Sequence, residues 1–200
     1  NYHNSFNSVH RTEDIFAMTF EFKMKMTVSE LNSLSDNDFQ KVFANVVELH
    51  AEAAASVKEK RPFRNVTEII TEFHKYLDEL NVESKLKILK LHPDLAGKLA
   101  SLGELTVEST EEQRAAGLDR LTPDQKQILH QNNQRYKDKF GFPFIICAKE
   151  NKIQSIIAGL KSRYNNAYDH EIDIGLTEVK KICKLRIQDI VKDEICLSNR

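Results

Sequence analysis

Apolar residues recur at intervals of three and four residues in one segment of this chain after another. The first two series are Phe39, Val42, Phe43, Val46, Val47 and Leu49, and then Val66, Ile69, Ile70, Phe73, Leu77 and Leu80. Because a helix places residues three and four apart on one face, each series forms an apolar stripe along a helix. Six glycines and four prolines in 200 residues fit a helical protein better than a turn-rich sheet protein. The pattern therefore predicts an all-α fold.

Prolines divide the helical pattern into separate helices. Pro62 ends the first helical region, because its ring excludes the helical backbone hydrogen bond. A helix over 82–91 must end near Leu91, because the residue before Pro93 is pushed out of the α region. Further helices are predicted at 107–116, at 151–164, and from about His170 to Val191. Another is predicted from a cap at Thr122, with Pro123 at its first position, to about Lys139, with Ile128, Leu129 and Tyr136 inward. The alanine-rich segment 51–60 either continues the first helix or begins another, and 98–106 is expected to be a connector.

The composition bounds the number of domains. Two hundred residues with 40% apolar content can bury one sizeable core, or two small ones at most. We expect a single helical domain of about eight helices over residues 27–192, followed by a tail at 193–200. Residues 1–26 are expected to be an extension or tag that is poorly ordered, and the weakly alternating MTFEFKMKM at 18–26 is a candidate short strand. The extension lacks the apolar segment of a secretory signal.

Charge and cysteine usage limit the kinds of binding partner and the cellular compartment that we expect for the chain. The 29 basic and 30 acidic side chains leave a net charge of -1, so we expect neither nucleic acid nor a membrane as a partner. No apolar stretch approaches the roughly 20 residues of a membrane-spanning helix. The three cysteines, Cys147, Cys183 and Cys196, form no CxxC pair. We expect them to be reduced and dispensable, in an intracellular compartment.

One apolar run, FGFPFIICA at 140–148, has no helical periodicity. A single apolar strand cannot form a sheet alone, and Gly141 and Pro143 favour an extended connector that crosses the core. The backbone N–H and C=O groups of such a connector need hydrogen-bond partners. Neighbouring helices can supply these partners, or a bound ligand can.

Arg186 interrupts an apolar stripe on the last predicted helix. At about 100° per residue it falls in the stripe formed by Val179, Ile182, Cys183 and Ile190, whereas Lys180, Lys181 and Lys184 point away. An arginine on an inward face needs an anionic partner, because an unpaired buried charge is costly. That partner is either a carboxylate of the core or a bound anionic ligand.

The segment ESTEEQ at 108–113 fits a capping box at Ser109 and Glu112. The same spacing also places Ser109, Glu112 and Gln113 on one helical face. A hydroxyl, a carboxylate and an amide together suit a polar ligand that has several N–H donors and a carbonyl. Both interpretations hold together only if the helix starts before Ser109, with Thr106 as its cap.

His92 is the histidine of interest because it lies at a helix end directly before Pro93. A neutral imidazole can act as general base or acid near neutral pH, although from the residues alone a surface or capping histidine is the better explanation of this position. The chain contains neither HExxH nor a pair of Glu-x-x-His motifs, so the sequence predicts no metal site.

Several of these segments together resemble one family. They are RPF at 61–63, HPDLAG at 92–97, ES-x-EEQ at 108–113, AG at 116–117, FGFPFIICA, and EVKKIC-x-LR at 178–186. In this order, over about 27–192, they resemble 2-oxo-4-hydroxy-4-carboxy-5-ureidoimidazoline (OHCU) decarboxylases. These carboxy-lyases produce (S)-allantoin in urate degradation, a part of purine catabolism. The alternative, a helical interaction module without chemistry, does not explain this order of motifs.

The resemblance implies roles for ten residues. The implied catalytic residues are His92 as the acid/base, Glu112 and Arg186. The implied substrate-binding residues are Pro93, Ser109, Glu112, Gln113, Phe144, Ile145, Ile146, Ala148 and Arg186. No cofactor and no metal are expected, because a C=N bond of the substrate ring can accept the electrons left behind by CO2.

The resemblance also implies a homodimer and a compartment. The family is typically homodimeric, and the chain is expected to be cytoplasmic or peroxisomal. Many eukaryotic members end in a peroxisomal tripeptide, whereas this chain ends in Ser-Asn-Arg.

Overall fold

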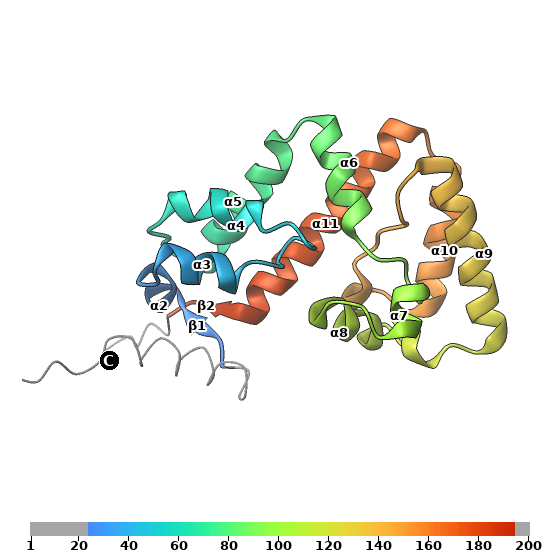
Figure 1. The fold of residues 1–200 in the computed structure, drawn as a ribbon, viewed down its shortest axis with the longest axis horizontal. Helices are drawn as coiled ribbons and strands as arrows, with labels where there is room; N and C mark the ends of the chain where they lie inside the picture. The colour runs from blue at the N-terminus through green and yellow to red at the C-terminus, as the bar shows by residue number, and fades with distance from the viewer. Residues whose placement is uncertain (1–23, 195–200) are drawn as a thin grey trace, which may run out of the picture.

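The longest helix, α11 (Tyr168–Ile190), runs diagonally through the molecule, and other helices pack along it on both sides (Figure 1). The computed structural model describes residues 24–194. α11 packs against α5 (Val66–Glu79) and α6 (Val82–Leu91), and its Gly175 lies close to Leu89 of α6. This position puts the middle of α11 at the centre of the apolar core.

The described residues contain ten α-helices, three short 3-10 helices and two short strands, which confirms the predicted all-α class. The remaining α-helices are α2 (Val28–Asn32), α3 (Asp36–Val42), α4 (Glu52–Val57), α7 (Lys98–Leu102), α8 (Val107–Ala115), α9 (Pro123–Phe140) and α10 (Ile153–Arg163). The 3-10 helices are η1 (Lys58–Lys60), η2 (Leu118–Arg120) and η3 (Ala148–Glu150). The additional helices are short ones, such as α7, which occupies the expected connector at 98–106.

The first predicted helix is shorter than its apolar stripe. α3 ends at Val42, and residues 43–50 form turns before α4 begins as a separate helix. Leu49 has a φ of 50°, which a helix does not allow, and its backbone N–H is bonded to the side chain of Asn45 (2.8 Å). A local side-chain bond of this kind competes with helical hydrogen bonding. The prediction of a helix through Leu49 was therefore wrong, although Val46 and Val47 are buried as expected.

The two strands join the ends of the described chain. β1 (Met26–Thr27) pairs in parallel with β2 (Val191–Lys192), with Met26 opposite Val191. Most of the predicted strand at 18–26 lies outside the described residues. Thr27 also caps α2, because its side chain accepts the N–H of Glu30.

Two predicted helix caps are confirmed. Thr106 caps α8 through the N–H of Ser109, so that Ser109 lies inside the helix as the second interpretation of ESTEEQ requires. Thr122 caps α9, with Pro123 at the first helical position. On α9, Ile128 is 36% exposed, so its predicted inward position was wrong.

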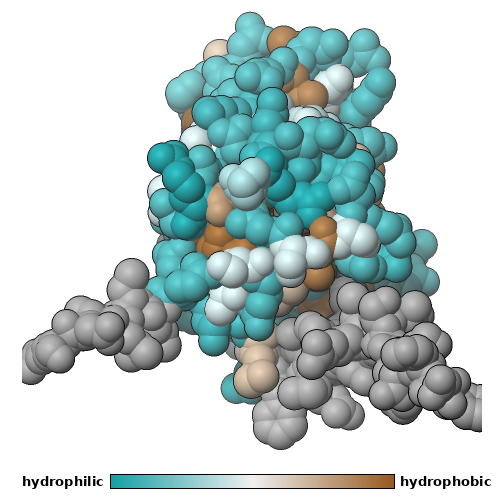
Figure 2. Space-filling view, turned by 90° about the vertical axis from the view of Figure 1, so that its left-hand side faces the viewer, coloured by the Kyte–Doolittle hydropathy of each residue, from teal (hydrophilic) through white to brown (hydrophobic). Residues whose placement is uncertain are grey.

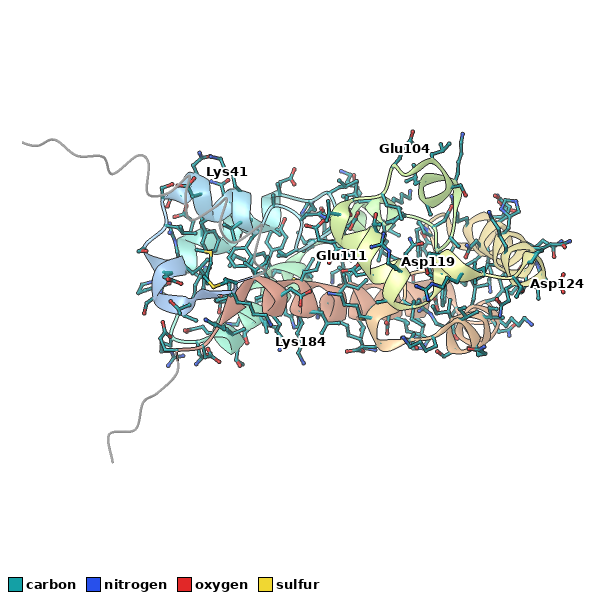
Figure 3. All side chains as sticks on the ribbon, turned by 90° about the horizontal axis from the view of Figure 1, so that it is seen from below. Lys41, Glu104, Glu111, Asp119, Asp124 and Lys184 are labelled. Atoms are coloured by element: carbon teal, nitrogen blue, oxygen red, sulfur yellow. The ribbon has the colours of Figure 1, made fainter. Side chains whose placement is uncertain are left out.

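The surface of the molecule is mostly hydrophilic where Figure 2 shows it, at the end formed by α2 and α3, with a few apolar side chains between the polar ones. Within residues 24–194, no helix is long and apolar enough to cross a membrane. Lys184 projects from the outer side of α11, as the stripe on that helix predicts (Figure 3).

A tight loop follows α6 and joins it to α7. His92 is extended (φ -74°, ψ 140°), which is the conformation expected before a proline, and Ala96 has a φ of 50°. A Cβ atom added at Gly97 would lie 2.6 Å from the Cβ of Asp94. The loop can therefore close in this form only with glycine at position 97.

We expect Gly97→Ala to lower the free energy of unfolding by about 1–3 kcal/mol, because overpacking of this kind forces backbone shifts. The matched control is Gly159→Ala in α10, where the added Cβ would meet the Phe144 ring at an ordinary 3.5 Å. That change should be neutral or stabilising by up to about 1 kcal/mol, because alanine is the better helix former. Urea denaturation measures both, and equal stabilities of the two variants would contradict the prediction.

Candidate active site

A narrow pocket lies where the loop after α6, α8, the connector 141–147 and α11 meet. Its lining residues are His92, Pro93, Leu95, Ser109, Glu112, Gln113, Phe144, Ile145, Ile146, Ala148, Ile182 and Arg186. The structure thus brings together all ten residues that the sequence analysis places at the substrate. It adds two apolar residues, Leu95 and Ile182, which the sequence analysis did not place at the substrate.

The pocket is smaller than a cavity beside it. Its free volume is about 30 Å³, close to the share of one water molecule in the liquid. The neighbouring cavity has about 370 Å³ and shares Gln113 with the pocket. Its charged residues, such as Arg114 and Lys126, are exposed, whereas His92 and Arg186 in the pocket are buried. Buried titratable groups mark the smaller pocket as the candidate site, and a ligand of several atoms requires it to widen.

Arg186 is the most strongly bonded residue of the pocket. It is 3% exposed, and its Nε and Nη2 donate to the two oxygens of Glu112 at 2.7 and 2.8 Å. Nη2 also lies 2.7 Å from a carboxylate oxygen of Glu48, and Nη1 donates to the carbonyl of Asn45 (2.7 Å). Burial lowers the pKa of Arg186, but the hydrogen bonds and charges of Glu112 and Glu48 outweigh burial and raise it. The guanidinium therefore stays charged.

Glu48 is the carboxylate of this ion cluster that the sequence analysis missed. It is 1% exposed and accepts hydrogen bonds from the hydroxyls of Thr106 (2.9 Å) and Ser109 (3.0 Å). Its signal in the sequence is its position between Val47 and Leu49, two residues of the apolar series. The helical interpretation of residues 43–49 concealed it, because Glu48 would have pointed away from the stripe.

One of the two interpretations of Arg186, a carboxylate partner in the core, is confirmed, and the other, a bound anionic ligand, stays a prediction. Arg186 forms a structural ion pair with carboxylates of the core, and it also lines the pocket. A substitution at this position therefore affects stability, which the substrate interpretation alone would not predict.

We expect Arg186→Met to cost about 3–5 kcal/mol of stability, because Glu48 and Glu112 are left buried without a cation. Adding Glu48→Gln and Glu112→Gln to the same variant should recover most of that loss, since the unpaired charges are then gone. Urea denaturation of the single and triple variants measures the difference. A single variant as stable as the wild type would show that the ion cluster contributes nothing to folding.

His92 is buried and has one ring nitrogen bonded and one free. Its Nδ1 lies 3.0 Å from the carbonyl of Ile88, so we assign the proton to Nδ1. Its buried Nε2 has no hydrogen-bond partner among the described residues. Burial lowers the pKa of His92 to about 4; the charge of Arg186 adds to this effect, while Ile88 and Glu48 oppose it. The pocket therefore contains a neutral imidazole whose Nε2 lone pair is available.

The pKa of His92 predicts a pH dependence of stability. Between about pH 6.5 and 4 the unfolded chain binds a proton at this position and the folded chain does not, so stability falls as the pH falls through this window. Below about pH 4 both states are protonated and the contribution is constant. At about 1.4 kcal/mol per pKa unit, the loss reaches about 3 kcal/mol.

The matched comparison is His92→Gln, which lacks this contribution while other titrating groups remain. We expect the stability of the wild type relative to the variant to decrease as the pH is lowered from 7.5 to 4.5 in urea denaturation. A constant difference between the two proteins over this range would contradict the low pKa.

The loop that carries His92 is bonded to neighbouring helices. Gln113 accepts the backbone N–H of Ala96 (2.9 Å), Asn133 donates to the carbonyl of Leu95 (3.0 Å), and Lys137 pairs with Asp94 (3.0 Å). Part of the Gln113 amide is therefore engaged with the loop, which the sequence analysis did not foresee.

The connector is bonded to helices at several of its backbone groups. Arg163 of α10 donates to the carbonyl of Ile145 (2.7 Å), and Glu178 of α11 accepts the N–H of Cys147 (2.8 Å). Arg163 also pairs with the fully buried Glu171. Within residues 24–194, no hydrogen bond involves the N–H of Ile146. Neighbouring helices thus satisfy part of the connector, and at least one N–H remains for a ligand.

Clustered metal ligands and cysteines are the other groups that the sequence analysis considered. Within the described part of the chain, no three His, Cys, Asp or Glu side chains form a group that could hold a metal ion. Cys147 and Cys183 are free and buried, and burial raises the pKa of both thiols. Cys196 lies outside the described residues.

Residues 32–188 match the sequence profile of the family described as OHCU decarboxylase. The chain belongs to this family. The OHCU decarboxylase of Xenopus laevis is 40% identical over 169 residues, which are 84% of this chain and 97% of the relative. The OHCU decarboxylase of Amia calva is also 40% identical, over 84% of this chain and 95% of the relative. That of Mus musculus is 36% identical, over 83% and 93%.

Solved structures share the helical fold of this OHCU decarboxylase family member. A crystal structure of OHCU decarboxylase in the presence of (S)-allantoin superposes with a TM-score of 0.58 at 26% identity, over 77% of this chain and 96% of that one. An (S)-allantoin synthase superposes with a TM-score of 0.67 over 82% of this chain and 54% of that one. At 20% identity, the second likeness concerns the fold alone.

Proposed function

We propose that this chain decarboxylates OHCU to (S)-allantoin in the breakdown of urate, without a cofactor. The observation that carries the proposal is a neutral His92 whose free Nε2 lies in the same buried pocket as Arg186. Family membership supports it, because relatives that are 36–40% identical carry the name of this activity. A helical interaction module has no need of a buried ion cluster beside an unpartnered imidazole.

The hydrogen-bonding groups of the pocket match those of the substrate. The Oγ of Ser109, the carboxylate of Glu112 and the Nε2 of His92 are acceptors, which suit the N–H groups of a ureido arm and a hydroxyl proton. The guanidinium of Arg186 supplies the positive charge for a carboxylate or a ring carbonyl. The N–H of Ile146 is a further donor, and so is the amide proton of Gln113 that does not face the carbonyl of Asp94 (3.4 Å).

His92 moves a proton in the proposed reaction. The C–C bond to the carboxylate breaks, CO2 leaves, and the bonding electrons enter the adjacent C=N of the ring, whose nitrogen takes a proton from solvent. The Nε2 of His92 then accepts the hydroxyl proton and returns it to the ring carbon that bears the ureido arm. The hydroxyl carbon becomes a carbonyl, so that one proton is consumed and allantoin and CO2 are formed.

A fixed pose of the substrate accounts for a single enantiomer. Arg186, paired to Glu112 in a fork, and the connector both line the pocket and can together fix the orientation of the ring. His92 lies on the loop after α6, and it therefore reaches one face of the ring only. Protonation from that face gives (S)-allantoin.

The remaining partner and compartment assignments stay predictions. We propose that the chain forms a homodimer, as the family typically does, and that it is cytoplasmic or peroxisomal. Exposed apolar side chains on α7 and α8, namely Leu99, Leu102 and Val107, provide a surface for a second copy.

The proposed function is tested with His92→Gln, assayed with freshly generated OHCU. Loss of the acid/base group should lower kcat by on the order of 10²–10⁴ while the fold is retained. The matched control is His130→Gln, the same change at an exposed histidine of α9, which should leave kcat unchanged. A folded His92→Gln variant with the wild-type kcat would rule out the proposed role of His92, and a wild type that does not accelerate the decay of OHCU would rule out the function.

A further inference from the structure

Glu48 does not line the pocket, but it is bonded to two residues that do. One of its carboxylate oxygens accepts the hydroxyl proton of Ser109 (3.0 Å) and lies 2.7 Å from Nη2 of Arg186. The other oxygen accepts the hydroxyl of Thr106 (2.9 Å). Glu48 is 1% exposed, so its carboxylate interacts with Ser109, Arg186 and Thr106 and not with solvent.

The bond to Glu48 decides what Ser109 can offer to a ligand. A hydroxyl has a single hydrogen, and in Ser109 this hydrogen points to Glu48 and away from the pocket. The Oγ atom also lies 3.3 Å from Nη2 of Arg186. The hydroxyl oxygen keeps a lone pair for the pocket, so Ser109 can accept a hydrogen bond there. A carboxylate enforces this direction, because an ionised carboxylate cannot donate.

We propose that Glu48 is a positioning residue that makes Ser109 an acceptor for a ureido N–H of the substrate. The inference rests on the proposed function and adds a determinant of specificity to it. Glu48 does not touch the substrate and acts through Ser109. An amide at position 48 could donate to Oγ and so turn the hydroxyl hydrogen of Ser109 towards the pocket, where it would face the N–H donors of the ureido arm.

The test compares two ligands by calorimetry. (S)-Allantoin carries the ureido arm, and hydantoin is the same ring without it. We expect Glu48→Gln to bind (S)-allantoin about tenfold more weakly than the wild type, the value of one hydrogen bond to a polar group. Its affinity for hydantoin should change less than about twofold. Glu104→Gln, the same substitution at an exposed residue, is the control and should bind both ligands as the wild type does.

A double-mutant cycle tests whether Glu48 acts through Ser109. Ser109→Ala should show the same selective loss for (S)-allantoin, and combining it with Glu48→Gln should add little further loss. Additive losses would overturn the proposed route. An equal loss for both ligands in Glu48→Gln would overturn the proposal, since Glu48 would then only shape the pocket, and so would an unchanged affinity for (S)-allantoin.

An unfolded Glu48→Gln variant and a failure of the proposed function give different results in this experiment. If Glu48→Gln does not fold by circular dichroism, Ser109→Ala decides, and wild-type binding of both ligands by that variant overturns the proposal. A wild type that binds neither ligand and does not turn over OHCU defeats the proposed function. A wild type that binds and turns over, beside a Glu48→Gln variant that behaves identically, defeats only the role of Glu48.

Discussion

One buried cation joins three parts of the chain that lie far apart in the sequence. Arg186 of α11 is bonded to Glu112 of α8 and to Asn45 and Glu48 of the turns after α3. Buried ion pairs contribute little net stability relative to apolar packing, because the desolvation of the charges offsets their attraction. The cluster is therefore better explained by the side chains that it holds in place than by a gain in stability. It places a guanidinium, a carboxylate and the Ser109 hydroxyl around one small pocket.

The rest of the pocket depends on backbone segments that are not helical. The loop with His92 follows α6 and is bonded to α9 through Asn133, and the connector is bonded to α10 through Arg163. Segments without regular structure carry backbone groups that need partners, and neighbouring helices supply some of them. The helices thus form the scaffold, while the loop and the connector bring the imidazole and backbone donors to the ligand.

The sequence predicted the helices with long stripes and the inward position of Arg186, because helical periodicity reports burial directly. The family motifs predicted the ten residues that the pocket brings together. Periodicity failed at residues 43–49, where Asn45 bonds to the backbone of Leu49 and turns replace the helix. For this reason Glu48 was missed. The mutual bonds of Glu112 and Arg186, and those of Gln113 with the loop, depend on tertiary distances, which no local pattern contains.

The most direct test of the account is the optical activity of the product formed by the wild-type protein. Freshly generated OHCU is mixed with the protein, and the circular dichroism of the solution is followed at the wavelengths of allantoin absorption. The account predicts rapid appearance of the spectrum of (S)-allantoin alone, because His92 reaches one face of the ring. A racemic product at the rate of the spontaneous reaction would contradict it.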